Sequence, residues 1–315
     1  MLFFMPFLNF KQYYMHTFIM ICIYILLTQG LNLISGFTGQ LSLGHAAFYG
    51  IGAYASALLS LRLGVPVWLS IPVAAVFAGV FGIALGFPCL RLKGPYLVIA
   101  TLGFGEIMRL IFLNWVKLTR GPMGITGIMS PETADLGFIK FSFDTKKTYF
   151  LLVLLIVILT VYFLNKLINS KTGRAMIAIR EDQIAAELMG VNITYYKLFA
   201  LVLSAFLAGL AGALYAHYIR YISPDSFVIS ESINILVMVV IGGMGTIIGP
   251  IIGSIFIELL LEYMRILQEY RLIIYGLLLF FTIIYLPGGL AGLARSVFEK
   301  ILLLIDRKRK IKCTE

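Results

Sequence analysis

Charged residues are scarce in this sequence. Of its 315 residues, 13% are Asp, Glu, Lys or Arg, whereas a soluble domain carries about a quarter. The deficit indicates that most of the protein surface faces lipid. The net charge of +10 does not indicate a nucleic-acid partner, because seven of the 25 basic residues lie between Arg295 and Lys312. Beside a membrane, such a cluster sets topology and contacts anionic lipid.

Cysteine and histidine are also scarce, with three of each. Cys22 and Cys89 lie in apolar runs and Cys313 lies in the basic C-terminal cluster, a spacing that suits neither a disulfide framework nor a zinc site. The histidines, at positions 16, 45 and 217, are too dispersed for metal ligation. The sequence also lacks the clustered Asp, His and Ser of a membrane enzyme. We therefore expect no catalytic residues and no metal site.

Long apolar runs are abundant, since 60% of the residues are hydrophobic. Several runs approach or exceed the ~18–20 residues of a transmembrane helix. They lack the alternating pattern of barrel strands, and only helices or closed barrels satisfy backbone polar groups in lipid. The sequence predicts an all-α, polytopic membrane bundle. The predicted spans are residues 15–34, 46–61, 67–90, 96–112, 148–164, 198–218 and 272–286.

One further segment, residues 227–261, is too long for a single helix. Glycines and Pro250 interrupt it between residues 242 and 250, so we expect two spans there. Residues 1–10 contain Pro6 and are too short to span unaided, which gives nine membrane segments without them and ten with them. We expect one transmembrane domain over 1–293, with a cytoplasmic loop at 166–197, and a basic cytoplasmic tail over 294–315.

Glycines break the stretch that follows the first long run. Gly36, Gly39 and Gly44 interrupt it, and polar side chains lie among them. Broken helices of this kind often build transport sites, although a polar turn at the membrane surface would have the same pattern. Gly39 and Gly44 have P-loop spacing, but His45-Ala46 stands where Lys-Ser/Thr must hold phosphate and magnesium. We therefore expect this chain to bind no nucleotide.

A second motif begins at Gly94-Pro95, where proline suits the first turn of a helix. Glu106 and Arg109 are three residues apart on one helix face and can pair. Placing a charge inside a membrane helix costs free energy, so such a pair indicates a functional site. Alternatively, the pair lies at the membrane interface, where an exposed ion pair adds little to stability. The loop over 115–147 is longer than a simple connection requires, and it either receives a binding protein or is an ordinary surface loop.

The charged stretch 166–197, which we call the island, separates two apolar runs. From Glu181 to Met189 most residues favour a helix. Ile184, Ala185 and Leu188 form one apolar stripe on it. Gly190 suits the C-terminal stop of this helix. The expected structure is a short amphipathic helix at the cytoplasmic face, which contacts either a partner protein or lipid head groups.

The ordered set of motifs resembles the membrane subunit of the branched-chain (hydrophobic) amino acid ABC importers. The resemblance lies in residues 32–54, 91–106, 120–127, 173–216, 241–253 and 287–292. It implies a type II-like importer permease of about ten helices in a bacterial or archaeal cytoplasmic (inner) membrane. It also implies a second homologous permease subunit, two ATP-binding subunits that hold ATP and Mg²⁺, and an extracytoplasmic solute-binding protein.

The same resemblance assigns roles to particular residues. The residues expected to couple to the ATPase are Arg180, Glu181, Ala185, Ala186, Glu187 and Gly190. The residues expected to border the solute pathway, with Glu106 added as a charge within a span, are Asn32, Gly36, Gln40, Ser42, His45, Tyr96, Thr101 and Glu106. The expected cargo is leucine, isoleucine and valine.

Two alternatives remain open at this point. The same architecture carries urea or short amides, other amino acids or a sugar in related permeases, and no side chain here decides between them. An ion-coupled secondary transporter would need carboxylates or unwound carbonyls at the midplane, and the spans hold few acids apart from Glu106 and Glu258.

Overall fold

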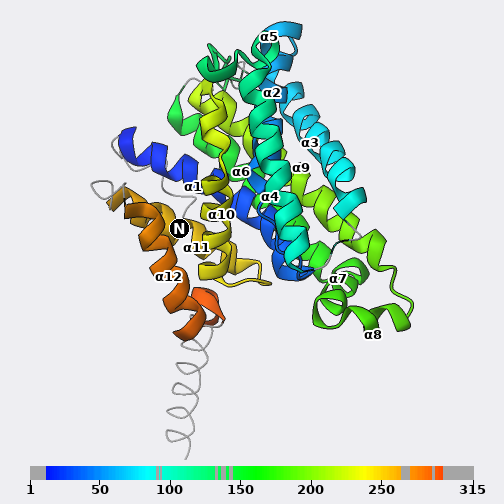
Figure 1. Ribbon diagram of the computed structural model, residues 1–315. Helices are drawn as coiled ribbons and strands as arrows, with labels where there is room; N and C mark the ends of the chain where they lie inside the picture. Colours follow the sequence, from blue (N-terminus) through cyan, green and yellow to red (C-terminus); the bar gives the residue numbers. More distant parts are fainter. Residues whose placement is uncertain are drawn as a thin grey trace, which may run out of the picture.

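The computed structural model describes residues 12–89, 92, 94–131, 134–135, 140–141, 145–263, 270–285 and 288–293. Long helices run side by side through the described part of the chain (Figure 1). The short segment 1–10 and the basic tail 294–315, on which two expectations rest, lie outside the described residues.

Helices α1 to α6 follow the first five predicted spans, with short elements between them. α5 and a 3₁₀ turn, η3, follow α4, and two strand pairs lie near this loop. β1 (Ile125–Thr126) pairs antiparallel with β4 (Tyr221–Ile222), and β2 (Ala134–Asp135) with β3 (Lys140–Phe141). The helical bounds are α1 Gln12–Asn32, η2 Leu33–Phe37, α2 His45–Leu63, α3 Val67–Cys89, α4 Pro95–Asn114, α5 Val116–Thr119, η3 Gly121–Met123 and α6 Lys146–Ile168.

The second half contains the island and the remaining long helices. Its helical bounds are α7 Lys171–Glu181, α8 Gln183–Leu188, α9 Ile193–Ile219, η4 Pro224–Phe227, α10 Ile229–Gly242, α11 Ile248–Tyr263 and α12 Arg271–Tyr285. The segment predicted as two spans is indeed two helices, α10 and α11, joined by residues 243–247.

Seven helical segments of the described part are long and apolar enough to cross a membrane. One of them joins α1 to η2 and another joins η4 to α10. The helices α11 and α12, with 16 and 15 residues, are shorter than these. The expected polytopic helical bundle is therefore confirmed.

Helix α9 lies at the centre, packed against α3, α2 and α1. Small residues allow this contact: Gly52 on α2 faces the backbone of Gly209, and Gly212 faces the backbone at Tyr49. A Cβ atom at Gly52 or Gly212 would overlap the facing helix. Between membrane helices, small residues allow the backbones to approach in this way.

The two ends of the bundle carry different elements. The island helices α7 and α8 lie at the lower right of Figure 1, and α5 lies at the top. η2 and residues 243–247 lie at the island end, because Arg180 of α7 contacts both Gly36 and Gly245. The β1–β4 pair ties the 115–147 loop to the C-terminal end of α9. The two ends are connected by α6, which follows the single span predicted over residues 148–164.

Candidate coupling segment and solute pathway

The island folds as two helices rather than one. The helix expected from Glu181 instead begins at Gln183, because Asp182 caps α8. Its side chain accepts hydrogen bonds from the backbone N–H groups of Ile184 and Ala185 at 2.8 and 3.1 Å. An aspartate at this position satisfies amides that a helix start otherwise leaves unpaired. The sequence-based start was therefore two residues too early.

The end of α8 agrees with the expected stop. Gly190 has φ +81°, a left-handed conformation that glycine adopts without strain. Its N–H group donates to the carbonyl of Glu187 at 2.9 Å. Two residues later, the Asn192 side chain accepts from the N–H group of Tyr195 at 3.0 Å and caps α9. A tight turn thus connects α8 directly to the central membrane helix.

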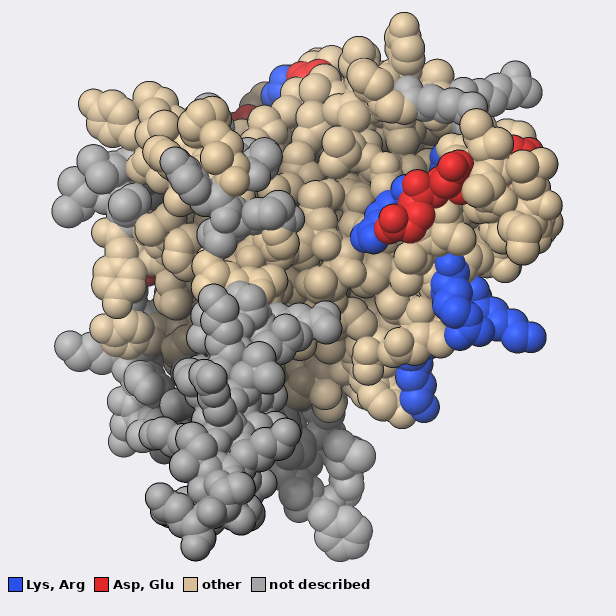
Figure 2. Space-filling view, turned by 90° about the horizontal axis from the view of Figure 1, so that it is seen from below, with Lys and Arg blue, Asp and Glu red and all other residues tan. Residues whose placement is uncertain are grey.

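Helix α8 presents apolar side chains away from the bundle. Ile184, Leu188 and Met189 are 71, 83 and 84% exposed, whereas Ala186 packs inward. We call these three exposed side chains the α8 tip. Among the expected coupling residues, Glu181, Ala185, Glu187 and Gly190 are exposed beside the tip. In Figure 2, acidic and basic side chains lie next to each other on the right of the face seen from below. Exposed apolar side chains rimmed by charge are typical of a docking surface.

Arg180, the remaining coupling candidate, reaches into the bundle. Its guanidinium group donates to the carbonyl of Gly36 at 2.9 Å and pairs with the Glu181 carboxylate at 2.6 Å. Its Cγ atom lies against Gly39, and its guanidinium lies beside Gly245. One side chain of α7 therefore holds the broken end of α1 and the α10–α11 connection together.

We call residues 33–44, which lie between α1 and α2, the break. The break begins as a π-helical turn, η2. Asn32 is fully buried and bridges η2 to residues 243–247. Its amide group donates to the Thr246 carbonyl at 2.9 Å, and its oxygen accepts from the Gly245 N–H group at 2.9 Å. A Cβ atom on Gly36 would overlap Asn32 and Gly245. Asn32 and Gly36 thus fix the break through backbone contacts, and both are buried.

The chain then turns back into the bundle before α2 begins. The N–H group of Leu43 donates to the Thr101 hydroxyl at 3.1 Å, and Gly44 lies against the Thr101 carbonyl. His45, the first residue of α2, is buried beside Gly30. The next N–H group, that of Ala46, donates to the Ser232 hydroxyl at 2.9 Å. The start of α2 is therefore held inside the protein by α4 and α10.

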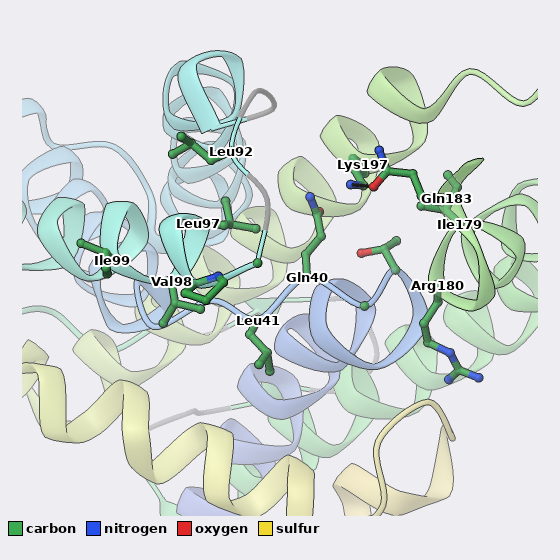
Figure 3. Close-up of a pocket in the computed structure, with 14 residues that line it drawn as sticks. Gln40, Leu41, Leu92, Leu97, Val98, Ile99, Ile179, Arg180, Gln183 and Lys197 are labelled. Atoms are coloured by element: carbon green, nitrogen blue, oxygen red, sulfur yellow. Dashed lines mark hydrogen bonds between the residues drawn. The ribbon is translucent and has the colours of Figure 1, made fainter. Parts of the chain in front are cut away.

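A cavity of about 620 Å³ opens between the break, the foot of α4 and the island. Gln40 extends from the break, and the Lys197 ammonium group donates to the Gln183 side chain at 2.9 Å on another wall (Figure 3). Most of the other walls are apolar. The lining residues are Thr38, Gly39, Gln40, Leu41, Leu92, Gly94, Pro95, Leu97, Val98, Ile99, Ile179, Arg180, Gln183 and Lys197.

The expected pathway residues fall into three groups. Gln40 lines this cavity, and Ser42 and Thr101 border a smaller pocket next to it that also includes Gln40. Asn32, Gly36 and His45 are buried in the break or beside it. Tyr96 and Glu106 lie elsewhere: Tyr96 is 71% exposed on α4, and Glu106 pairs with Arg109 on the exposed side of the same helix.

Sequence reasoning did not select Gln183 and Lys197 as lining residues. A lysine near the start of a membrane helix is commonly a topology signal, and only the fold places it opposite Gln40. Within the residues that the structure describes, no group of three or more His, Cys, Asp or Glu side chains is arranged to hold a metal ion.

The helical bundle, the broken helix α1–η2 and the island define a multi-pass membrane protein of the permease class. The family model for "branched-chain amino acid transport system / permease component" matches residues 13–283, and the chain belongs to this family. The expected family is therefore confirmed.

Individual relatives agree with this family. The high-affinity branched-chain amino acid transport system permease protein LivM of Escherichia coli is 40% identical over 291 residues, which cover 87% of this chain and 68% of LivM. Methanocaldococcus jannaschii has two relatives, each 25% identical. One is the probable branched-chain amino acid transport permease protein LivM, and its match covers 77% of this chain and 71% of that LivM. The other is the probable permease protein LivH, and its match covers 88% of this chain and 91% of LivH. None of the solved structures matches the chain significantly.

Proposed function

We propose that this chain is a membrane-spanning permease subunit of an ATP-driven importer for leucine, isoleucine and valine. An extracytoplasmic solute-binding protein delivers the amino acid, and two separate ATP-binding subunits, which hold ATP and Mg²⁺, power its passage. A second homologous permease subunit completes the pathway in the cytoplasmic (inner) membrane of a bacterium or archaeon. Support comes from the family and from relatives whose names state branched-chain amino acid transport.

The observation that carries the mechanism is the connection from the α8 tip to the break. The tip exposes Ile184, Leu188 and Met189, which suit a groove on an ATP-binding subunit. Arg180, four residues before Ile184 in the sequence, contacts the Gly36 carbonyl in η2. A displacement of the island therefore acts directly on the end of α1 and, through Gly245, on the α10–α11 connection.

This connection supports alternating access. ATP binding brings the two ATP-binding subunits together and moves the island. Arg180 transfers that movement to η2, while Asn32 keeps η2 and residues 243–247 together as one unit. Coupling of this kind requires an element with two arrangements that both partners bias, and the break is that element. The chain itself contributes no covalent chemistry.

The cavity at the island end supplies the inward-facing part of the pathway. Its size lies within the ~300–1,000 Å³ of ordinary small-molecule sites. Its walls are mostly apolar with few polar groups, Gln40 and the Gln183–Lys197 pair among them. An aliphatic amino acid has the same division, with one apolar end and one polar end. We therefore assign this cavity to the solute as it leaves toward the cytoplasm.

The decisive experiment reconstitutes the complete complex in proteoliposomes and measures leucine uptake. We expect uptake that requires both ATP and the binding protein, and competition by isoleucine and valine but not by urea or a sugar. Uptake driven by an ion gradient without either partner would overturn the transport mechanism. Competition by urea or a sugar instead of the aliphatic amino acids would overturn the assigned cargo while leaving the mechanism intact.

A further inference from the structure

Among the described helices, α3, α4, α6 and α12 expose long apolar faces, and the face on α4 differs in chemistry. On α3 the exposed side is bulky and apolar, as Phe77 and Val80 illustrate, and on α6 Leu155 and Ile158 do the same. Between residues 69 and 87 of α3 and between 151 and 163 of α6, no exposed or half-buried residue is charged or a glycine, and residues 273–284 of α12 include the exposed Gly276 but no charged residue. Such faces suit lipid chains, which are as apolar as leucine.

Helix α4 is different. Its most apolar stretch is 22% buried, close to the 28% of α6, so most of this helix faces outward. The face carries a glycine and half of an ion pair along with its apolar residues. We call it the α4 face, and it consists of Tyr96, Ile99, Gly103, Glu106, Ile107 and Leu110.

The ion pair does not suit a lipid environment. Glu106 accepts hydrogen bonds from the Arg109 guanidinium at 2.6 and 3.0 Å, and the two side chains remain 35 and 24% exposed. Glu106 lies eight residues before Asn114 at the end of α4, which is about 12 Å along the axis. α4 has 20 residues and is therefore about 30 Å long, as long as the hydrocarbon core is thick, so Glu106 lies in the middle part of this membrane-spanning helix. Charges within a membrane helix almost always face protein or a watery cavity rather than lipid.

The glycine leads to the same conclusion. Gly103 lies near the centre of the α4 face, and a Cβ atom there would meet nothing within 4 Å. Among the described residues, no neighbour explains the lack of a side chain at Gly103, and the same is true of Gly276 on α12. Glycine in a helix interior costs about 1 kcal/mol relative to alanine. In membranes, small residues on a helix face allow another helix to approach closely.

We propose that the α4 face is the surface on which the second permease subunit docks within the membrane. The partner's identity rests on the proposed function, whereas the surface rests on Glu106, Arg109 and Gly103. A soluble partner does not reach this depth, and M. jannaschii contains at least two distinct permease proteins that are relatives of this chain. Ile99 belongs to both the α4 face and the cavity wall, so the second subunit would lie beside the cavity.

Site-directed photocrosslinking in the assembled complex tests the surface. The reactive residue p-benzoylphenylalanine replaces Ile107 on the α4 face, Ile158 on α6 or Val80 on α3, all apolar and exposed. We expect an adduct with the second permease subunit from position 107 and lipid adducts from 158 and 80. An adduct with the second permease from 158 or 80 but not from 107 would overturn the proposal. An adduct of position 107 with another copy of this chain would also overturn it.

A second measurement uses the open space at Gly103. A Cβ atom at position 103 meets nothing within 4 Å among the described residues, so we expect Gly103→Trp to fill the approach of a partner helix while its abundance and thermal stability stay near wild type. We expect co-purification of the second permease subunit to fall at least tenfold, whereas Leu155→Trp on α6 should leave it unchanged. Normal co-purification with Gly103→Trp would contradict the docking site. A wild-type complex that assembles with the second permease subunit through position 107 but takes up no leucine would instead count against the proposed function and leave the docking surface unaffected.

Discussion

At the scale of single residues, Arg180 is the side chain on which the transport hypothesis depends most. It lies on the island, yet its guanidinium group contacts Gly36 and Gly245 and its Cγ atom lies against Gly39. The guanidinium group of an arginine offers several donors in a fixed planar geometry. The residue is therefore suited to transmit movement and not only to contact an ATP-binding subunit.

Replacing Arg180 by alanine should separate ATP hydrolysis from transport. A hydrogen bond from a charged donor contributes about 1.5–3 kcal/mol, so we expect uptake per ATP hydrolysed to fall roughly tenfold or more. Binding-protein-stimulated ATPase activity and leucine uptake, measured in the same proteoliposomes, give this ratio. Arg174→Ala on the same helix is the control, because that side chain bonds only locally to Asn169. An unchanged ratio in Arg180→Ala would remove Arg180 from the coupling route.

The glycines of the α2–α9 contact give a second prediction at this scale. Gly52→Ala places a methyl group into the backbone at Gly209, and such overpacking costs about 1–3 kcal/mol. We expect a lower thermal unfolding temperature for the purified protein in detergent. Gly276→Ala on α12, where a Cβ atom meets nothing, should leave that temperature unchanged or raise it, since alanine favours a helix. Equal stability of both variants would contradict the close helix contact.

At the scale of elements, the α8 tip and its connection to α9 carry the functional argument. Leu188→Asp places a charge in the exposed apolar tip without disturbing the bundle, since Leu188 is 83% exposed. Central apolar residues of an interface contribute 2 kcal/mol or more. We expect the affinity for the ATP-binding subunits to fall about tenfold or more in a pull-down titration. Thr194→Asp, also exposed but outside the tip, should bind normally, and equal binding by both variants would exclude the tip as the docking surface.

The turn after α8 gives a related prediction. Gly190→Pro removes the N–H group that bonds to Glu187 and imposes a negative φ where the chain has +81°. The link between α8 and α9 should loosen, so ATP hydrolysis continues while leucine uptake falls. Assembly should persist, because the turn lies outside the α8 tip. Full uptake in this variant would show that force does not pass through the α8–α9 turn.

Element positions were largely predictable from sequence, and element ends were not. Long apolar runs placed the membrane helices, and the glycines near 242–250 correctly divided α10 from α11. The start of α8 was wrong because Asp182 and Glu181 both suit a first turn, and only backbone geometry shows which one caps. The β1–β4 pair joins segments about a hundred residues apart, and no local pattern encodes that pairing.

The candidate site was predictable to a similar extent. Glycines 36, 39 and 44 marked the break, and the charged stretch marked the island. The partners of Asn32 and Arg180 were not predictable, because Thr246 and Gly36 lie 214 and 144 residues from them. Tyr96 was grouped with Thr101 from proximity in sequence, yet five positions on a helix turn them to different faces, one exposed and one buried.

At the scale of the whole molecule, the two ends of the bundle should face opposite sides of the membrane. Thr194 at the start of α9 and Lys146 at the start of α6 are exposed at opposite ends. We expect Thr194→Cys to react with a membrane-impermeant maleimide only from the cytoplasmic side and Lys146→Cys only from the other. Cys313→Ser gives the background, since Cys22 and Cys89 are buried. Labelling of both positions from one side would contradict this topology.

The long-range bonds of α1 also bear on how the protein is made. Thr28, Gln29 and Asn32 lie near the beginning of the chain, and their partners Ser254, Ile247 and Thr246 follow 226, 218 and 214 residues later. At about 5–20 residues per second, ribosomes deliver those partners roughly 10–45 s after α1. Throughout that interval these polar side chains sit in the bilayer without their final neighbours. The nascent protein therefore completes its core only when the C-terminal helices insert. In a chain that stops after α9, the polar side chains of α1 lack these hydrogen-bond partners.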